Sequence, residues 1–255
     1  MDNESNNSHH RLYVFAFIFA LIYAFALFIK IVKVSRENDP YYNQYNDRYK
    51  DLEYFDPEKE YKTVADLLGS YIYISENGKY TKYYVFYSLK GYYAELIRTE
   101  ALDKRFEWSS YPKSPYRHGI IDDYLVNNIY NSFSESVKKE SYPMILQNTL
   151  DGFQSDIYIY LLTMERIKQI AGAGLEWNEN LIRNLKPGTW VLTVSSEPEL
   201  NQFKGLEDNQ PVFTTVHYSS VGYVQPVIAV NSYAAIEKVN NPDTDEMIWV
   251  IKGDK

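Results

Sequence analysis

The sequence predicts an α+β protein in which one N-terminal transmembrane helix precedes a soluble domain with an antiparallel β-sheet and about three helices. Three observations predict this class. A long uncharged apolar run stands near the start, strand patterns flank a helical middle, and Asn77-Gly78 separates two aromatic segments. The chain is divided accordingly into a polar tail (1–11), a transmembrane helix (12–34), a juxtamembrane linker with a short helix (35–60) and the α+β domain (61–255).

The membrane segment rests on the run from Leu12 to Ile29, which holds no charge, and on the apolar residues that continue past Lys30 to Val34. At 1.5 Å per residue such a helix covers roughly 27 to 35 Å, the thickness of a hydrocarbon core. A cleaved signal peptide is the alternative, but the leader is acidic and the apolar run is too long for one. We therefore expect an integral, single-pass membrane protein.

Small residues form a stripe on one face of this helix, at Ala16, Ala20 and Ala24. Small residues allow a second helix to approach closely, so the stripe predicts helix packing in a homo- or hetero-oligomer. Basic residues after the span favour a cytoplasmic domain, whereas long C-terminal domains translocate regardless of charge and the lack of cysteine suits an oxidising compartment. We favour the extracytoplasmic side.

The elements before residue 110 follow from cap, turn and alternation signals. Asp39-Pro40 begins a short tyrosine-rich helix in the juxtamembrane segment, and Thr63 with Asp66 caps a helix that Gly69 ends. Alternating segments then predict four strands, at residues 70–75, 80–87, 91–98 and 105–108.

The first two strands form a hairpin because Asn-Gly suits a type I′ turn, in which both central residues need positive φ. This register places Tyr71 opposite Tyr84, Ile72 opposite Tyr83, and Glu76 opposite Lys79 as an ion pair. The more aliphatic face, with Ile72, Ile74, Tyr83, Val85 and Tyr87, is expected to meet the helices. The other face is the predicted partner surface, which consists of Tyr71, Tyr73, Tyr80, Lys82, Tyr84 and Phe86.

Apolar steps of four from Ile121 to Val137 predict one continuous helix in the middle of the chain. Residues 155–170 predict a second helix by their length, although DIYIYLL alternates like a strand, and residues 177–185 predict a third. The last third returns to β structure, with Pro226 indicating an edge or a bulge. Its predicted strands are residues 189–195, 211–218, 222–231 and 246–252.

Charge and composition exclude several function classes. A net charge of −8 and a pI near 5.1 disfavour nucleic acid as a partner, and the absence of cysteine excludes thiolate chemistry. No nucleotide, hydrolase or zinc motif is present, and we expect no cofactor and no metal. Tyrosine is abundant, with 26 residues. Codon bias and a recognition surface both account for such abundance.

Few residues suggest catalysis. His118 lies near Asp122 and Asp123, and His217 precedes two serines, so each is a candidate for proton transfer or metal binding. The acidic group Asp243 to Glu246 has the composition of a turn. We therefore expect a non-enzymatic scaffold subunit of a larger membrane-associated complex. The alternatives are an acidic, immunity-like protein that neutralises a basic partner and, less favoured, a hydrolase centred on His217.

Overall fold

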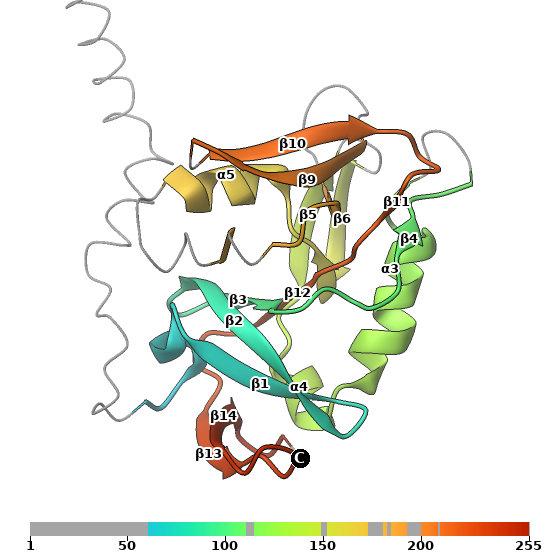
Figure 1. The fold of residues 1–255 in the computed structure, drawn as a ribbon. Coiled ribbons are helices and arrows are strands. Elements are labelled where there is room, and N and C mark those ends of the chain that lie inside the picture. The colour runs from blue at the N-terminus through green and yellow to red at the C-terminus, as the bar shows by residue number, and fades with distance from the viewer. Residues whose placement is uncertain are drawn as a thin grey trace, which may run out of the picture. The chain divides into compact units, whose positions relative to one another are not determined.

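The structure is a computed structural model, and it describes residues 61–110, 115–148, 152–172, 181–182, 185–192, 200–208 and 210–254. All of these residues belong to the second of the two units into which the chain divides, residues 54–255. This unit is an α+β domain in which strands predominate (Figure 1), so the predicted α+β class is confirmed for it.

The predicted membrane helix at 12–34, its stripe at Ala16, Ala20 and Ala24, and the juxtamembrane helix lie outside the described residues. Within the described ranges, we find no helix with the length and apolar character needed to cross a membrane.

A seven-stranded sheet has the order β13-β14-β1-β2-β3-β12-β7. Its strands are β1 (Tyr71–Glu76), β2 (Lys79–Leu89), β3 (Tyr93–Arg98), β7 (Ile159–Leu161), β12 (Pro226–Asn231), β13 (Ile236–Asn240) and β14 (Met247–Ile251). The sheet is mixed rather than antiparallel, because β14 pairs with β1 in parallel, with Val250 opposite Tyr73. This correction has a physical reason: the last hairpin joins the first strand through long-range contacts, which no local pattern encodes.

The predicted β1–β2 hairpin is confirmed in its register. Tyr71 pairs with Tyr84, Ile72 with Tyr83 and Glu76 with Lys79. Asn77 has φ 52° and Gly78 has φ 76°, as a type I′ turn requires.

Beyond the hairpin, a β-bulge changes which residues share a face. Val85 pairs with Leu96 and Tyr87 pairs with Glu95, so Phe86 is the extra residue in β2. The face that holds Tyr84 therefore continues with Tyr87, and the prediction that Tyr87 lies with Ile72 and Val85 is wrong. The alternation rule failed because a bulge shifts the parity of every later residue.

Smaller sheets complete the β structure. They comprise β8 (Thr189–Val191), β9 (Leu200–Glu207) and β10 (Gln210–Val216) in one sheet, β4 (Phe106–Glu107) with β11 (Val221–Gly222), and β5 (Met144–Asn148) with β6 (Gly152–Ile157). The sequence patterns did not predict β5, β9 or β13. Pro226 stands at the first position of β12, where its missing N–H is tolerated.

The predicted helix over 121–137 is broken into four pieces. These are α3 (Ile120–Tyr124), the π-helical η2 (Leu125–Ile129), the 3₁₀ turn η3 (Tyr130–Ser132) and α4 (Glu135–Glu140). A step of four residues overshoots a full α-helical turn by about 40°, so a straight helix would rotate the apolar residues away from the core. The π turn and the break at Phe133 keep all five apolar side chains buried.

Two other helix predictions change. Residues 155–161 lie in β6 and β7 rather than in a helix, and only α5 (Met164–Gly172) is helical. The alternation in DIYIYLL was the stronger signal, because β7 pairs with β12 and is buried. The short helix at Thr63 is the 3₁₀ helix η1 (Val64–Leu67), where the Asp66 carboxylate accepts the backbone N–H of Thr63 at 2.9 Å. The predicted third helix, at 177–185, lies mostly outside the described residues.

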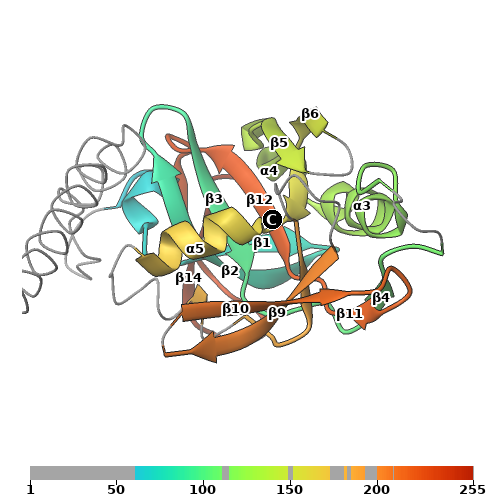
Figure 2. The same cartoon turned by 90° about the horizontal axis from the view of Figure 1, so that it is seen from above.

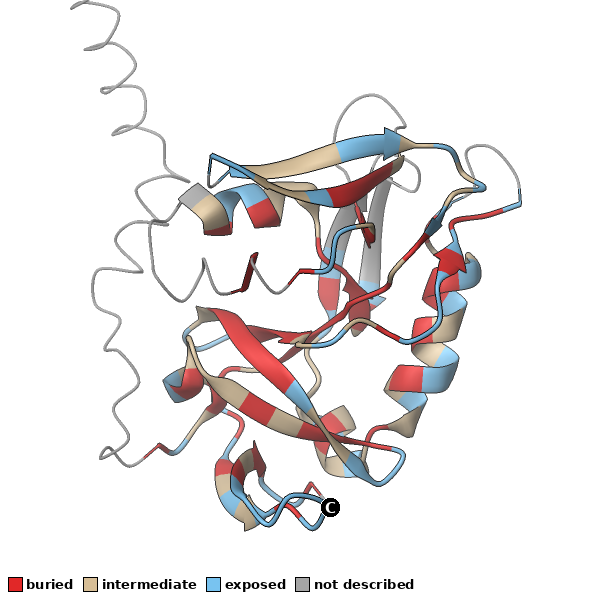
Figure 3. Cartoon of the chain, in the orientation of Figure 1, coloured by how far each residue is buried: buried red, intermediate tan, exposed pale blue. Residues whose placement is uncertain are grey.

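The core lies on both faces of the central strands. Ile72, Ile74 and Val85 are fully buried, and every residue of β12 from Pro226 to Val230 is buried as well. Figure 3 shows buried residues along β2 and along the inner side of the helical segment. The second face is covered by α5, which crosses the strands in Figure 2 and reaches Glu95 through Arg166.

Candidate functional site

The predicted partner surface is divided by burial. Lys82 is exposed, and its Nζ lies 3.9 Å from the centre of the Tyr71 ring, while Tyr73 is half-buried. Tyr80 is also half-buried, and its hydroxyl donates to the carbonyl of Asp254 at 3.1 Å.

Tyr84 and Phe86 do not belong to an exposed surface, since they are 5% and 0% exposed. Tyr84 lies in a central strand, and the Tyr71 ring is centred 5.3 Å from its own ring. Phe86 is the bulge residue. This part of the prediction is wrong, because both side chains are buried within a central strand of the sheet.

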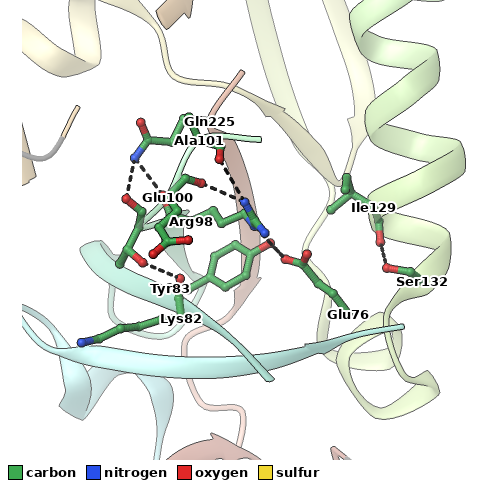
Figure 4. Close-up of polar contacts among 10 residues, drawn as sticks. Glu76, Lys82, Tyr83, Arg98, Glu100, Ala101, Ile129, Ser132 and Gln225 are labelled. Carbon is green, nitrogen blue, oxygen red and sulfur yellow. Dashed lines mark hydrogen bonds and ion pairs between the residues drawn. The ribbon is translucent and has the colours of Figure 1, made fainter. Parts of the chain in front are cut away.

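A buried polar cluster lies where β1, β2 and β3 meet. The Tyr83 hydroxyl donates to Glu76 Oε1 at 2.7 Å, and Arg98 Nε lies 3.4 Å from the same oxygen (Figure 4). Glu76 is only 8% exposed. The predicted ion pair between Glu76 and Lys79 is therefore wrong, although the two residues are opposite each other. Glu76 turns to Arg98 because Tyr83 and Arg98 are themselves register partners on one face.

Arg98 also holds the chain after β3. Its guanidinium donates to the carbonyls of Glu100 and Ala101, and Gln225 Nε2 donates to the Arg98 carbonyl at 2.9 Å (Figure 4). The cluster thus joins β3 to the segment that enters β12. The Glu76 carboxylate is bound by the Arg98 guanidinium and the Tyr83 phenol, so the cluster is suited to holding the three strands in a fixed arrangement.

A second polar cluster lies on the opposite face. Arg166 of α5 forms an ion pair with Glu95 of β3 at 2.8 Å, and its guanidinium lies 4.1 Å from the centre of the Tyr87 ring. Burial lowers the pKa of Arg166, but the charge of Glu95 and the interactions with the surrounding tyrosines together outweigh it, so the pKa is raised. Tyr160 is buried beside this pair, and its phenol interacts with the Glu95 carboxylate.

The tyrosines of these clusters have raised pKa values. Burial is the main cause at Tyr83, Tyr93 and Tyr160, followed by the charge of Glu76 at Tyr83 and of Glu95 at the other two. The pKa of Tyr93 rises to about 12. Ionisation of these phenols is therefore opposed by the fold.

Alkaline titration is expected to expose this effect. An unfolded tyrosine ionises with its ordinary pKa of 10.0, so above that pH the unfolded state loses protons that the folded state keeps. The free energy of unfolding should be unaffected by these groups below about pH 10 and should fall as the pH rises above it. Tyrosinate absorbance should show a delayed fraction that appears together with loss of the folded tryptophan fluorescence. Ionisation of all tyrosines in a single wave near about pH 10, with the fold intact, would contradict the prediction.

His118 takes part in the start of α3. It has φ 59°, its backbone N–H donates to Asp122 Oδ2 at 2.8 Å, and Arg117 pairs with the same oxygen at 3.3 Å. The ligand atoms of His118, Asp122 and Asp123 lie within 4.8 Å of one another, so this group is the one in the described residues that could hold a metal ion. A cation there would compete with Arg117 for Asp122, which is 1% exposed.

His217 lies in an exposed turn. Its Nδ1 is 2.8 Å from Ser219 Oγ, and Ser220 N–H donates to the His217 carbonyl. In the described ranges no carboxylate hydrogen-bonds to this imidazole and no contact joins it to His118, so the Ser, His and Asp elements are not assembled there. The acidic segment is a turn as predicted, because Asp243 N–H donates to Asn241 Oδ1 at 3.0 Å.

The most exposed tyrosines lie in turns that the sequence patterns did not single out. Tyr92 is 59% exposed between β2 and β3, and Tyr233 is 54% exposed after β12. The sequence does place each of these tyrosines beside residues that favour turns. The many other tyrosines in the chain made these two impossible to single out.

The fold and these contacts define an α+β domain in which Glu–Arg pairs join strands to each other and to α5. Comparison of the chain with protein-family models, with curated proteins and with solved structures finds no match.

Proposed function

We propose that the protein is a non-enzymatic, single-pass membrane-anchored interaction subunit of a larger membrane-associated complex, with its folded domain on the extracytoplasmic side. The observation that carries the proposal is the pair Tyr92 and Tyr233, two largely exposed aromatic side chains on neighbouring turns. Exposed aromatics are enriched at the energetic centres of protein interfaces, because they bury a large area at a small entropy cost.

These two turns support each other. Ser232 N–H donates to the Tyr92 carbonyl at 3.3 Å, and Gly91 N–H donates to the Ser232 hydroxyl at 3.0 Å. Gly91 has φ 88°, and a Cβ there would lie 3.7 Å from the Tyr233 hydroxyl. Hydrogen bonds between the two turns therefore fix the backbone that carries both aromatic side chains, which lowers the conformational entropy lost on binding.

A second surface remains on the hairpin, where Tyr71, Tyr73 and Lys82 share a face by register. The membrane anchor is supported by the apolar run at 12–34. Its alanine stripe would add helix packing in the membrane to the contacts that the folded domain makes with a partner.

The test is affinity capture of the full-length protein from membranes. Tyr92→Ala with Tyr233→Ala is expected to weaken partner retention about tenfold or more, while changing the free energy of unfolding by less than about 0.5 kcal/mol per site. Tyr73→Ala is the matched variant on the hairpin face and should retain the partner. The His217→Ala protein should still perform its biological role, because no catalytic function is proposed for His217.

Unchanged capture by the protein with Tyr92→Ala and Tyr233→Ala, or an equal loss in Tyr73→Ala, would overturn the proposed surface. Loss of function in a folded His217→Ala protein would overturn the non-enzymatic assignment. The alternative of an immunity-like acidic binder is supported by the net charge of −8, which would attract a cationic partner. Capture distinguishes them, since several membrane subunits indicate a scaffold and one soluble basic protein indicates immunity.

A further inference from the structure

Two cations meet on one tyrosine ring at the junction of β4, β8 and β11. Lys186 Nζ lies 3.8 Å from the centre of the Tyr223 ring, and the Arg105 guanidinium carbon lies 4.9 Å from it. Both cationic side chains are exposed, and Tyr223 is half-buried. The three residues come from segments far apart in the chain, so only the fold creates this arrangement.

The backbone holds each of the three residues in place. Tyr223 N–H donates to the Gly188 carbonyl, and Trp190 N–H donates to the Tyr223 carbonyl, both at 2.9 Å. Arg105 Nη2 donates to the Val221 carbonyl at 3.1 Å. The Lys186 carbonyl accepts the hydroxyl of Thr189 at 2.6 Å, which closes the turn. Hydrogen bonds therefore fix the backbone on which Tyr223 and Lys186 stand, and they tie the Arg105 guanidinium to β11.

In the described part of the chain, no carboxylate lies within ion-pair distance of Arg105 or Lys186, although the protein carries an excess of acidic residues. Arg98, Arg117 and Arg166, by contrast, each pair with a carboxylate. An anion that reaches both side chains would supply the counter-charge that they lack among these residues.

We propose that Arg105, Lys186 and Tyr223 bind a phosphate monoester group. Such a group carries about −1.5 to −2 charges near neutral pH, which matches two cations, whereas a carboxylate would leave one uncompensated. Its oxygens point in several directions and accept from an arginine and a lysine at once. This site is separate from Tyr92 and Tyr233, so it goes beyond the proposed function.

The test is calorimetric titration of the purified full-length protein in detergent with inorganic phosphate, at constant ionic strength set by chloride. Saturable binding is expected. Arg105→Gln and Lys186→Gln should each weaken it by about threefold or more, and the double variant should abolish it. Lys104→Gln is the matched control, because Lys104 is the adjacent cation but rests on Phe106 at 5.1 Å. It should keep the affinity within about twofold.

Competition then distinguishes the source of the phosphate. Displacement of phosphate by micelles doped with phosphatidic acid, but not with phosphatidylcholine, supports the site with a lipid headgroup as ligand. Displacement by glycerol 3-phosphate alone supports it with a soluble ligand. No saturable phosphate binding, equal binding by the folded double variant, or an equal loss in Lys104→Gln would overturn the proposal, and thermal unfolding of each variant verifies that it is folded.

Discussion

Replacing Arg166 with Met is expected to lower the free energy of unfolding by about 3–5 kcal/mol, the usual cost of leaving one partner of a buried ion pair alone. The Glu95 side chain is 3% exposed and its Arg166 partner 20% exposed, so water cannot solvate the orphaned carboxylate. The guanidinium also contacts the Tyr87 ring, a contact that Met reproduces only in part. Chemical denaturation of the full-length protein, followed by tryptophan fluorescence, measures this loss.

Two companion variants define what that loss means. Glu95→Gln added to Arg166→Met should recover part of the stability, because it removes the uncompensated charge. Lys204→Met is the matched surface control, since Lys204 pairs with Glu207 at 3.2 Å but both side chains are more than half exposed. It should cost at most about 1 kcal/mol. Equal losses of unfolding free energy in Arg166→Met and Lys204→Met would show that the buried Glu95–Arg166 pair contributes no more to stability than an exposed pair.

Gly222→Ala is expected to destabilise the domain by about 1–3 kcal/mol or more through overpacking. A Cβ at Gly222 would lie 2.5 Å from Gln202 Nε2, 2.7 Å from Trp190 Nε1 and 2.8 Å from the Gly188 carbonyl oxygen. Trp190 cannot move freely, because it is fully buried and its Nε1–H donates to the Phe106 carbonyl at 2.9 Å. The same denaturation experiment applies.

Gly78→Ala separates this steric effect from backbone strain. Gly78 has φ 76° and open space around its Cα, so an added methyl group meets nothing and the cost is conformational, about 1–2 kcal/mol. At Gly222 the expected cost is instead steric, because the surrounding atoms lie close to the position of an added Cβ. If Gly222→Ala proved milder than Gly78→Ala, the packing around Trp190 would have to be looser than the distances indicate.

Local chemistry made the β1–β2 hairpin predictable. Asn77-Gly78 selects its turn, the turn sets the register, and the register placed Tyr71 opposite Tyr84 without reference to the rest of the fold. The apolar steps from Ile121 to Val137 were equally informative about burial, because all five side chains are in the core. They did not predict the shape of the backbone that buries them.

The tertiary structure decided everything that depends on contacts between distant segments. The bulge at Phe86 moved Tyr87 to the other face, α5 reached Glu95 through Arg166, and β14 joined β1 in parallel. None of these has a signature in its own segment, because each is set by pairing or packing against another segment of the chain.

The candidate sites divide along the same line. The sequence by itself determined the hairpin and the turn nature of Asp243 to Glu246. The membrane segment at 12–34 stays a prediction. Only the tertiary structure brought Arg166 to Glu95 and placed Arg105 and Lys186 on the ring of Tyr223. The physical reason is that turns and periodicity arise from neighbouring residues, whereas ion pairs and ring contacts arise from whichever side chains packing brings together.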